Sequence, residues 1–177
     1  MASFVHLRIK SAYSLLEGAV RPKELAELAR YAGTPAAAVT DTNNLFGVYE
    51  IAETLTKAGV QPIVGALLSV EFAARAPHHT GSRKKPPHLA LLVQNEEGYQ
   101  NLTKLLSSAY LDVEAGDWAH VPAEKLFARS EGLIALTGGP GGVINQLLLE
   151  GQRAAAGVLE DARAQPRLAP WHDHCVR

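Results

Sequence analysis

The stretch FVHLRIKSAYSLLEGA, residues 4–19, begins like a strand that would deliver histidine ligands to a metal ion. After His6, however, the next alternating positions hold Arg8 and Lys10, whose side chains offer a metal no lone pair at neutral pH. A divalent cation needs several neutral or anionic donors that converge on it, so two cations here argue against a metal centre.

Hydrophobic periodicity predicts three strands and two helices in the first part of the chain. The strands are FVHLRI, PAAAVTD, which ends in Asp41, and QPIVGALLSVEF. The helix RPKELAELARYAG has Pro22 in its first turn and Gly33 as its stop, and the helix LFGVYEIAETLTKAG ends at Gly59. This alternation implies parallel strands joined by crossover helices. The apolar face of the first helix is expected to hold Leu25, Leu28, Ala29 and Ala32.

The second part of the chain is less regular. Residues 73–87 contain three prolines, a glycine and a basic triplet, which predicts a surface loop. A strand HLALLVQ, a helix NEEGYQNLTKLLSSAYL capped by Asn95, and a strand GLIALTG follow, with an irregular stretch up to about Ala128 between the last two. A glycine-rich turn and further helical sequence come next. Five such strands describe part of an α/β barrel or an open sheet, where chemistry gathers at the carboxyl ends of the strands.

Composition excludes several classes of protein. The chain has 177 residues, enough for one well-buried domain, and its net charge of −1 gives no global field that would gather nucleic acid or anionic lipid. A single cysteine, Cys175, excludes a disulfide framework. No signal peptide and no membrane-spanning apolar run is evident, so we expect a soluble, cytoplasmic protein without a membrane partner.

Five segments at the strand ends carry a resemblance to a known family. They are FVHLRIKSAYSLLEGA, AVTDTNNLFG, QPIVGALLSV, HLALLVQNEEGYQNLTKL and GLIALTGGPGG. In order and spacing they resemble the PHP (polymerase and histidinol phosphatase) domain at the amino end of the alpha subunit of bacterial DNA polymerase III, a C-family replicative polymerase. The resemblance implies an α/β fold, here an incomplete, distorted (β/α)7 PHP-type barrel. We expect a partial PHP domain over residues 1–165 and a tail, 166–177, that does not match the family.

Active members of this family bind metal ions through histidines, carboxylates and a cysteine for phosphoester hydrolysis, and this sequence departs from their pattern. The residual positions of the family site are Glu17, Asp41 and His88. Positions where the family pattern has a ligand are replaced at Arg8, Lys10, Thr42, Leu67 and Gly139. We therefore expect no metal, no catalytic residue and no cofactor in this chain.

The two cations at the end of the first strand suggest what took the place of the metal. An unpaired buried carboxylate is costly, so we expect Arg8 and Lys10 to act as counter-charges for Glu17 and Asp41. The basic run SRKK, residues 82–85, is expected to be a solvated surface feature.

The resemblance also implies a biological setting. It suggests a fragment of a DNA-directed DNA polymerase, a nucleotidyltransferase of DNA replication that uses Mg²⁺ and DNA through the parent protein. Implied partners are the proofreading exonuclease subunit and other subunits of the polymerase III holoenzyme, for which a degenerate PHP domain serves as scaffold or docking surface. An alternative is a stand-alone metal-dependent PHP-superfamily phosphoesterase. A nucleotide-binding module that uses TGGPGG, residues 137–142, is a third possibility.

Overall fold

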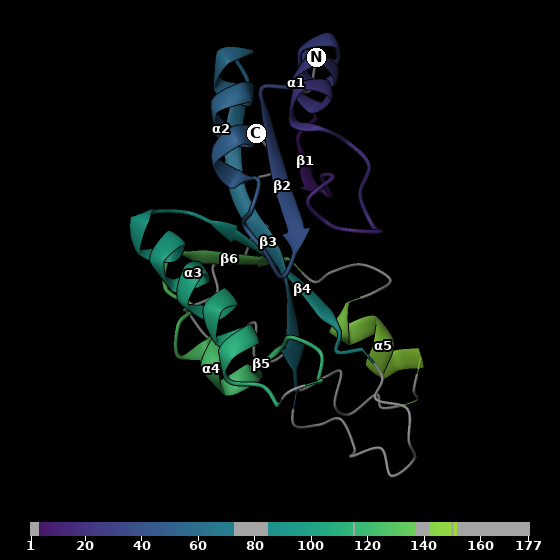
Figure 1. Ribbon diagram of the computed structural model, residues 1–177, viewed down its shortest axis with the longest axis vertical. Helices are drawn as coiled ribbons and strands as arrows, with labels where there is room; N and C mark the ends of the chain where they lie inside the picture. The colour runs from purple at the N-terminus through teal and green to yellow at the C-terminus, as the bar shows by residue number, and fades with distance from the viewer. Residues whose placement is uncertain (1–3, 73–84, 115, 137–141, 150, 152–177) are drawn as a thin grey trace.

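The computed structural model of the protein describes residues 4–72, 85–114, 116–136, 142–149 and 151. Its core is an open sheet of six strands with helices packed against it (Figure 1). The strands are β1 (His6–Ile9), β2 (Ala36–Thr42), β3 (Gln61–Glu71), β4 (His88–Val93), β5 (Val121–Pro122) and β6 (Leu133–Leu136). The helices are α1 (Pro22–Tyr31), α2 (Val48–Lys57), α3 (Glu96–Leu111), α4 (Ala123–Phe127) and α5 (Val143–Leu149).

The first three strands form the parallel arrangement that the sequence predicts. β1 pairs with β2 and β2 with β3, both in parallel, and α1 and α2 make the crossovers. Gly33 and Gly59 follow these helices with φ of 64° and 76°, a left-handed conformation that favours glycine and ends each helix. The α/β class and the incomplete, open barrel are thus confirmed.

The expectation of parallel strands is wrong for β4. The sheet order is β1-β2-β3-β4-β6, and β4 runs antiparallel to both β3 and β6. No helix lies between β3 and β4 in the described residues, so this connection lacks the crossover unit that makes neighbouring strands parallel. As a result, the first residue of β4 lies at the same sheet edge as the last residues of β2.

The stretch expected to be irregular contains two short elements. β5 pairs with the end of β3 in parallel, with Val70 opposite Val121, and α4 follows it directly. The count of five strands is therefore one too low. A two-residue strand has no detectable alternation, so periodicity could not reveal it.

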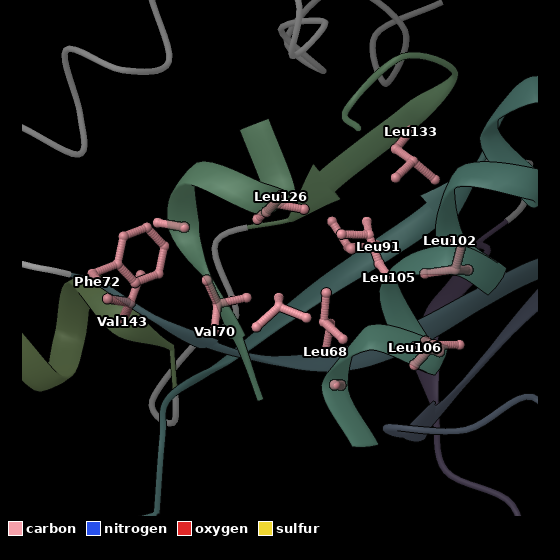
Figure 2. Packing of buried hydrophobic residues seen from close by; sticks show 14 residues of the cluster. Leu68, Val70, Phe72, Leu91, Leu102, Leu105, Leu106, Leu126, Leu133 and Val143 are labelled. Atoms are coloured by element: carbon pink, nitrogen blue, oxygen red, sulfur yellow. The ribbon is translucent and has the colours of Figure 1, made fainter. Parts of the chain in front are cut away.

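The helices that pack against β2 and β3 all cover the same face of the sheet. Residues that pair across strands share a face, and β2 contributes Ala37 and Val39 to the cluster under α1 and α2. On the same face, Leu68 and Val70 of β3 join a second cluster with leucines of α3 and α4 (Figure 2). The opposite face carries the register pairs Thr42–Leu67 and Ser69–His88. This second face is the one that holds most of the predicted site.

Helix α1 buries a different stripe from the one expected. Leu28 is 58% exposed and Ala32 is also exposed, whereas the buried residues are Pro22, Leu25, Ala26 and Ala29. Both sets have helical spacing. The helix is rotated relative to the expectation, so that Pro22 and Ala26 are buried in place of Leu28 and Ala32. Apolar spacing alone does not choose between two overlapping stripes that share Leu25 and Ala29.

The later predictions are confirmed where the structure describes them. Asn95 caps α3, with its side-chain oxygen accepting a hydrogen bond from the Gly98 N–H at 2.9 Å. Residues 85–87 precede β4 without forming a helix or strand, and 73–84 lie outside the described residues. The boundary predicted at residue 165 and the tail also lie outside them. No helix in the described part of the chain is long and apolar enough to cross a membrane.

Candidate functional site

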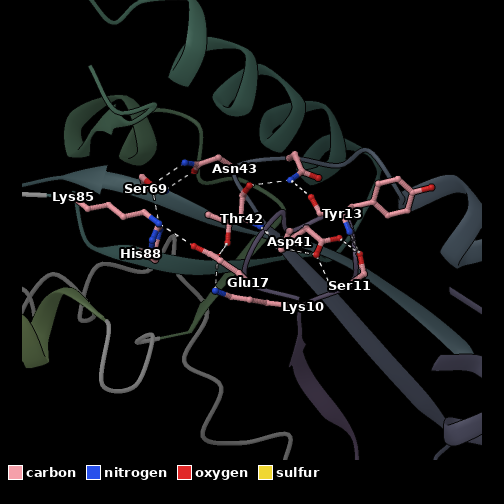
Figure 3. Close-up of polar contacts among 12 residues, drawn as sticks. Lys10, Ser11, Tyr13, Glu17, Asp41, Thr42, Asn43, Ser69, Lys85 and His88 are labelled. Atoms are coloured by element: carbon pink, nitrogen blue, oxygen red, sulfur yellow. Dashed lines mark hydrogen bonds and ion pairs between the residues drawn. The ribbon is translucent and has the colours of Figure 1, made fainter. Parts of the chain in front are cut away.

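The candidate site lies where the carboxyl ends of β1 and β2 meet the amino end of β4. The antiparallel direction of β4 places His88 opposite Ser69, close to the end of β2. The loop after β1 lies across the same edge and contributes Lys10, Ser11, Ser14 and Glu17 (Figure 3). Elements far apart in the sequence thus deliver polar side chains to one place.

Glu17 is held by two ammonium groups and a hydroxyl. Its Oε2 lies 2.7 Å from Lys10 Nζ and accepts a 2.6 Å hydrogen bond from Thr42 Oγ1. Its Oε1 lies 2.9 Å from Lys85 Nζ (Figure 3). The Glu17 side chain is only 28% exposed, so these ion pairs are partly shielded from water. The cluster ties together the end of β1, the end of β2 and the segment before β4.

These contacts stabilise the ionised form of Glu17. The hydrogen bond from Lys10 is the largest influence, followed by those from Thr42 and Lys85, and together they lower the pKa of Glu17 from 4.5 to about 2. The carboxylate is therefore charged throughout the physiological range. The prediction that Lys10 is a counter-charge for Glu17 is confirmed.

Asp41 has a different set of partners from the one expected. Its Oδ1 accepts hydrogen bonds from the Ser11 N–H at 2.8 Å and from Ser14 Oγ at 2.6 Å, and its Oδ2 accepts one from Ser11 Oγ at 2.6 Å. Only 4% of Asp41 is exposed, and these donors are neutral. The expectation of a cation beside Asp41 is therefore wrong for Lys10, which is engaged by Glu17.

The alternation of side chains along β2 explains this separation. Asp41 and Thr42 are successive residues of a strand and point to opposite faces of the sheet. Thr42 meets Glu17 on the face opposite the helices, whereas Asp41 belongs to the helix-covered face, where the loop after β1 folds over it. The two residual carboxylates therefore have different partners.

His88 belongs to a third set of contacts. Its Nδ1 lies 3.1 Å from Ser69 Oγ, and Ser69 Oγ in turn accepts a hydrogen bond from Asn43 Nδ2 at 2.9 Å. Burial lowers the pKa of His88, the charge of Lys85 lowers it further, and Glu17 partly opposes both. Lys10 and Arg8 add smaller effects in the same direction as Lys85. This imidazole lies in a hydrogen-bond network with Ser69 and Asn43, and its burial and the nearby cations lower its pKa and so favour its neutral form.

The residues present do not fit a divalent metal ion. Two ammonium groups occupy the oxygens of Glu17, serine donors occupy those of Asp41, and Ser69 faces one nitrogen of His88. Within the described ranges, no group of three or more histidine, cysteine, aspartate or glutamate side chains could hold a metal ion. A cation would have to displace existing charges and hydrogen bonds to gain even two of these donors.

The replaced family positions are accounted for as far as the structure describes them. Leu67, 1% exposed, lies beside Thr42 in the register of β2 and β3 and adds an apolar side chain where the resemblance expects a carboxylate. Arg8 is exposed on β1. Gly139 lies outside the described residues.

A pocket of about 370 Å³ opens next to the Glu17 cluster. Its lining includes the polar residues Thr42, Ser69 and Lys85 and the aromatic residues Tyr110 and Trp118. Lys85 Nζ lies 5.8 Å from the centre of the Trp118 ring, within the range of a cation–π contact. Lys85 therefore contacts both Glu17 and the ring of Trp118 at this pocket.

Several of these residues were not predicted as part of a site. Lys85 was expected to be solvated, yet it is 43% exposed and paired with Glu17; the rest of SRKK lies outside the described residues. Ser11, Ser14 and Ser69 carried no signal of their own, because a serine hydroxyl gains its role only from the partner that folding brings near it. Asn43, the first residue after β2, was not predicted either, and it links Ser69 to the backbone oxygen of Ala119.

Comparisons with known proteins show what the chain is similar to. The chain is 40% identical over 196 residues to the DNA polymerase III subunit alpha of Caulobacter vibrioides, covering 98% of this chain and 17% of that protein. It is 37% identical to the corresponding subunit of Pseudomonas aeruginosa, covering 96% of this chain and 13% of that protein. The chain thus spans less than a fifth of the length of these relatives. Among solved structures, an amidohydrolase from Chromobacterium violaceum matches with a TM-score of 0.45 and 23% identity, covering 59% of this chain and 32% of that one.

The family itself follows from the extent of a further match. Residues 6–174 match the PHP domain, a range that reaches beyond the domain end predicted at residue 165. It includes the ends of β1 and β2, the start of β4 and the loop that carries Glu17. Because this match covers most of its length, the chain belongs to the PHP domain family.

Proposed function

We propose that this chain acts as a non-hydrolytic PHP domain of a replicative DNA polymerase III alpha subunit. In this role it is a scaffold that docks the proofreading exonuclease subunit and contributes to the holoenzyme in the cytoplasm. Polymerisation of deoxynucleotides, with Mg²⁺ and DNA, would be an activity of the parent protein. The identity to alpha subunits supports this setting.

The observation that carries the proposal is the pairing of both oxygens of Glu17 with Lys10 and Lys85. An ammonium group supplies positive charge where a metal ion would sit in an active member, but it cannot activate water as a Lewis acid does. The ion pairs of Glu17 thus hold neighbouring segments together, but the site lacks a Lewis acid that could activate water for hydrolysis. The stand-alone phosphoesterase is less well supported, because the oxygens of Asp41 already accept hydrogen bonds from two serines.

Metal analysis of the purified chain, without an affinity tag, tests the loss of hydrolysis. The tail WHDHC, residues 171–175, could bind Zn²⁺ by itself, so the matched control carries His172→Ala, His174→Ala and Cys175→Ala. We expect no stoichiometric metal in this control and no phosphoesterase activity when Mn²⁺ or Zn²⁺ is added. A tightly bound divalent ion held by Asp41 and His88, with hydrolysis of a phosphomonoester, would overturn the proposal.

The docking role needs its own measurement. Titration of the chain with the proofreading exonuclease subunit of the same bacterium, followed by calorimetry, should show a one-to-one complex. The absence of binding would remove the docking role and leave only the structural one.

A further inference from the structure

His120 lies just before β5 and makes contacts through both nitrogens of its ring. Its Nδ1 lies 2.8 Å from the backbone oxygen of Trp118, and its Nε2 lies 3.2 Å from Glu71 Oε2 at the end of β3. Its backbone N–H donates to the Ala109 oxygen of α3 at 3.2 Å. The side chain is only 17% exposed, so these neighbours largely shield the ring from water. The ring therefore joins the segment that carries Trp118 to the last residue of β3.

The partners of the ring determine the protonation state in which both contacts are favourable. A backbone carbonyl and an ionised carboxylate are acceptors only, so each must receive a proton from the ring nitrogen that faces it. A neutral imidazole carries one N–H, whereas the imidazolium carries two. The contacts with Trp118 and Glu71 are therefore favourable together only when His120 is charged.

The loss of one proton must weaken one of the two contacts, and the structure indicates which. Glu71 is 61% exposed, so its carboxylate can turn into water at little cost. The Trp118 oxygen is the nearer partner, and it lies two residues from His120 along the chain. A neutral ring should therefore keep its proton on Nδ1 and release Glu71. A histidine ordinarily changes charge between about pH 5 and pH 8, which includes the physiological range.

The segment before His120 connects this ring to the candidate site. The Ala119 oxygen accepts a hydrogen bond from Asn43 Nδ2 at 3.1 Å. The Trp118 ring lies 5.8 Å from Lys85 Nζ, lines the pocket of about 370 Å³ and is 50% exposed. A change in the contacts of His120 thus reaches the Trp118 ring through two residues of backbone.

Other charged groups lie on the elements around the ring. They are Asp112 at the end of α3, Glu124 and Lys125 on α4, Glu114 and Asp117 on the segment before His120, and Lys85 beside Trp118. Asp112 and Lys125 pair with each other at 2.6 Å. Lys85 is paired with Glu17, whose pKa of about 2 leaves its carboxylate charged wherever a histidine titrates. These pairs therefore keep their charges while His120 changes its own.

We propose that His120 is a proton-operated link between the Trp118 segment and the end of β3. The charged ring binds both the Trp118 oxygen and Glu71. When Nε2 gives its proton to water, the neutral ring keeps Trp118 and releases Glu71, and the indole beside the pocket is then held less firmly. The link is a property of this chain alone and does not depend on the docking role.

Nitrogen NMR of the intact, ¹⁵N-labelled chain tests the protonation states directly, because ring nitrogens with and without a proton have different shifts. His120→Gln identifies the signals of this ring. We expect both nitrogens to carry a proton at about pH 5, and only Nδ1 to carry one at about pH 8. A neutral ring with its proton on Nε2, or a ring whose state is the same at both pH values, would overturn the proposal.

Fluorescence of Trp118 tests the consequence for the pocket. The chain has two tryptophans, so Trp171→Phe leaves Trp118 as the only one. In this background, quenching by acrylamide should rise between about pH 5 and pH 8, because the neutral ring no longer ties the segment to Glu71. Circular dichroism at both pH values establishes that each form of the chain is folded.

Two variants of Glu71 separate a proton-operated link from a merely structural contact. The amide of Glu71→Gln can accept from the charged ring and donate to the neutral one, so quenching should stay low at both pH values. Glu71→Ala has no link in either state, so quenching should be high at both. A pH-dependent rise that survives in Glu71→Ala contradicts the proposal.

Other histidines provide the matched controls. His6→Gln, on β1, and His88→Gln, which can still bond to Ser69, should keep the pH-dependent rise of the original chain. A rise that disappears in His88→Gln would assign the pH dependence to that ring and would also overturn the proposal.

Discussion

Lys10 Nζ lies 2.7 Å from Glu17 Oε2, at the end of a strand where active members of the PHP domain family hold metal ions. This ion pair does structurally what coordination would do, since it ties the loop after β1 to the sheet edge. Lys85 extends the tie to the start of β4. Unlike a bound metal ion, the two lysines are part of the chain and cannot be replaced by another ion from solution. The strength of their contacts depends on the charge of one carboxylate, that of Glu17.

The first prediction is that Glu17→Gln lowers the free energy of unfolding by about 1–2 kcal/mol, because it removes two partly exposed ion pairs and leaves two lysines close together. The pKa of Glu17 is lowered from 4.5 to about 2, so its contribution is complete above pH 4.5 and is lost as the pH falls toward 2. Urea denaturation over this acidic range measures both effects.

Glu53→Gln is the matched control for Glu17→Gln. Glu53 forms an exposed pair with Lys57 one helical turn away, at 2.8 Å, and such pairs contribute about 0.5 kcal/mol or less. If both variants lose the same small free energy of unfolding and still show the same loss of stability at acidic pH, the Glu17 cluster has no structural role.

A second prediction concerns Asp41→Asn. The buried carboxylate accepts three hydrogen bonds, and an amide offers only one oxygen as acceptor. We expect a loss of about 2–3 kcal/mol in urea denaturation, because hydrogen bonds to a charged group are among the stronger ones. Asp112→Asn, at an exposed carboxylate paired with Lys125, should cost much less. Equal effects at the two positions would mean that the serines do not depend on the charge of Asp41.

Periodicity and helix-stop residues were sufficient to predict most of the fold. Pro22, Gly33, Gly59 and Asn95 act locally, so their effects are visible in the sequence and are found in the structure. The direction of β4 was not visible, because it depends on pairing with β3 and not on the residues of β4. The buried stripe of α1 likewise depends on how the helix lies on the sheet.

The residues of the site could be predicted from the sequence more fully than the contacts that these residues make. The replacements at Lys10, Thr42 and Leu67 could be named from the sequence, and they indicated lost chemistry. That serines and not a cation bind Asp41 could not be predicted, because this depends on how the loop after β1 folds over the strand end. The pairing of Lys85 with Glu17 joins residues 68 positions apart, which no local pattern can report.

A third prediction concerns His88 and mildly acidic pH. Its pKa is lowered, chiefly by burial and then by Lys85, so the unfolded chain binds a proton more readily than the folded one. Stability should therefore be complete above pH 6.5, the usual pKa of histidine, and should fall as the pH drops below it. Denaturant titrations on either side of this pH measure the slope.

His88→Gln should reduce this slope, because glutamine can still bond to Ser69 but does not titrate. His6→Gln, at an exposed histidine on β1, is the matched control against which the slope of His88→Gln is compared. A slope that His88→Gln does not change would assign the pH dependence to other groups.

The last prediction is that ligand identity, and not the scaffold, is what this domain has lost. A variant that restores the family's donors should recover affinity for a divalent ion, and its melting temperature should rise when Zn²⁺ or Mn²⁺ is added, because a metal that binds only the folded state stabilises it. Without metal the variant should be less stable than the original chain, since Leu67 is buried and a glutamate there would be unpaired. A four-fold control that keeps Lys10 should bind less metal, because its ammonium still occupies Glu17. If the full variant folds and its melting temperature does not change when either ion is added, the strand ends no longer converge as the family site requires. The five substitutions are Arg8→His, Lys10→His, Thr42→His, Leu67→Glu and Gly139→Cys.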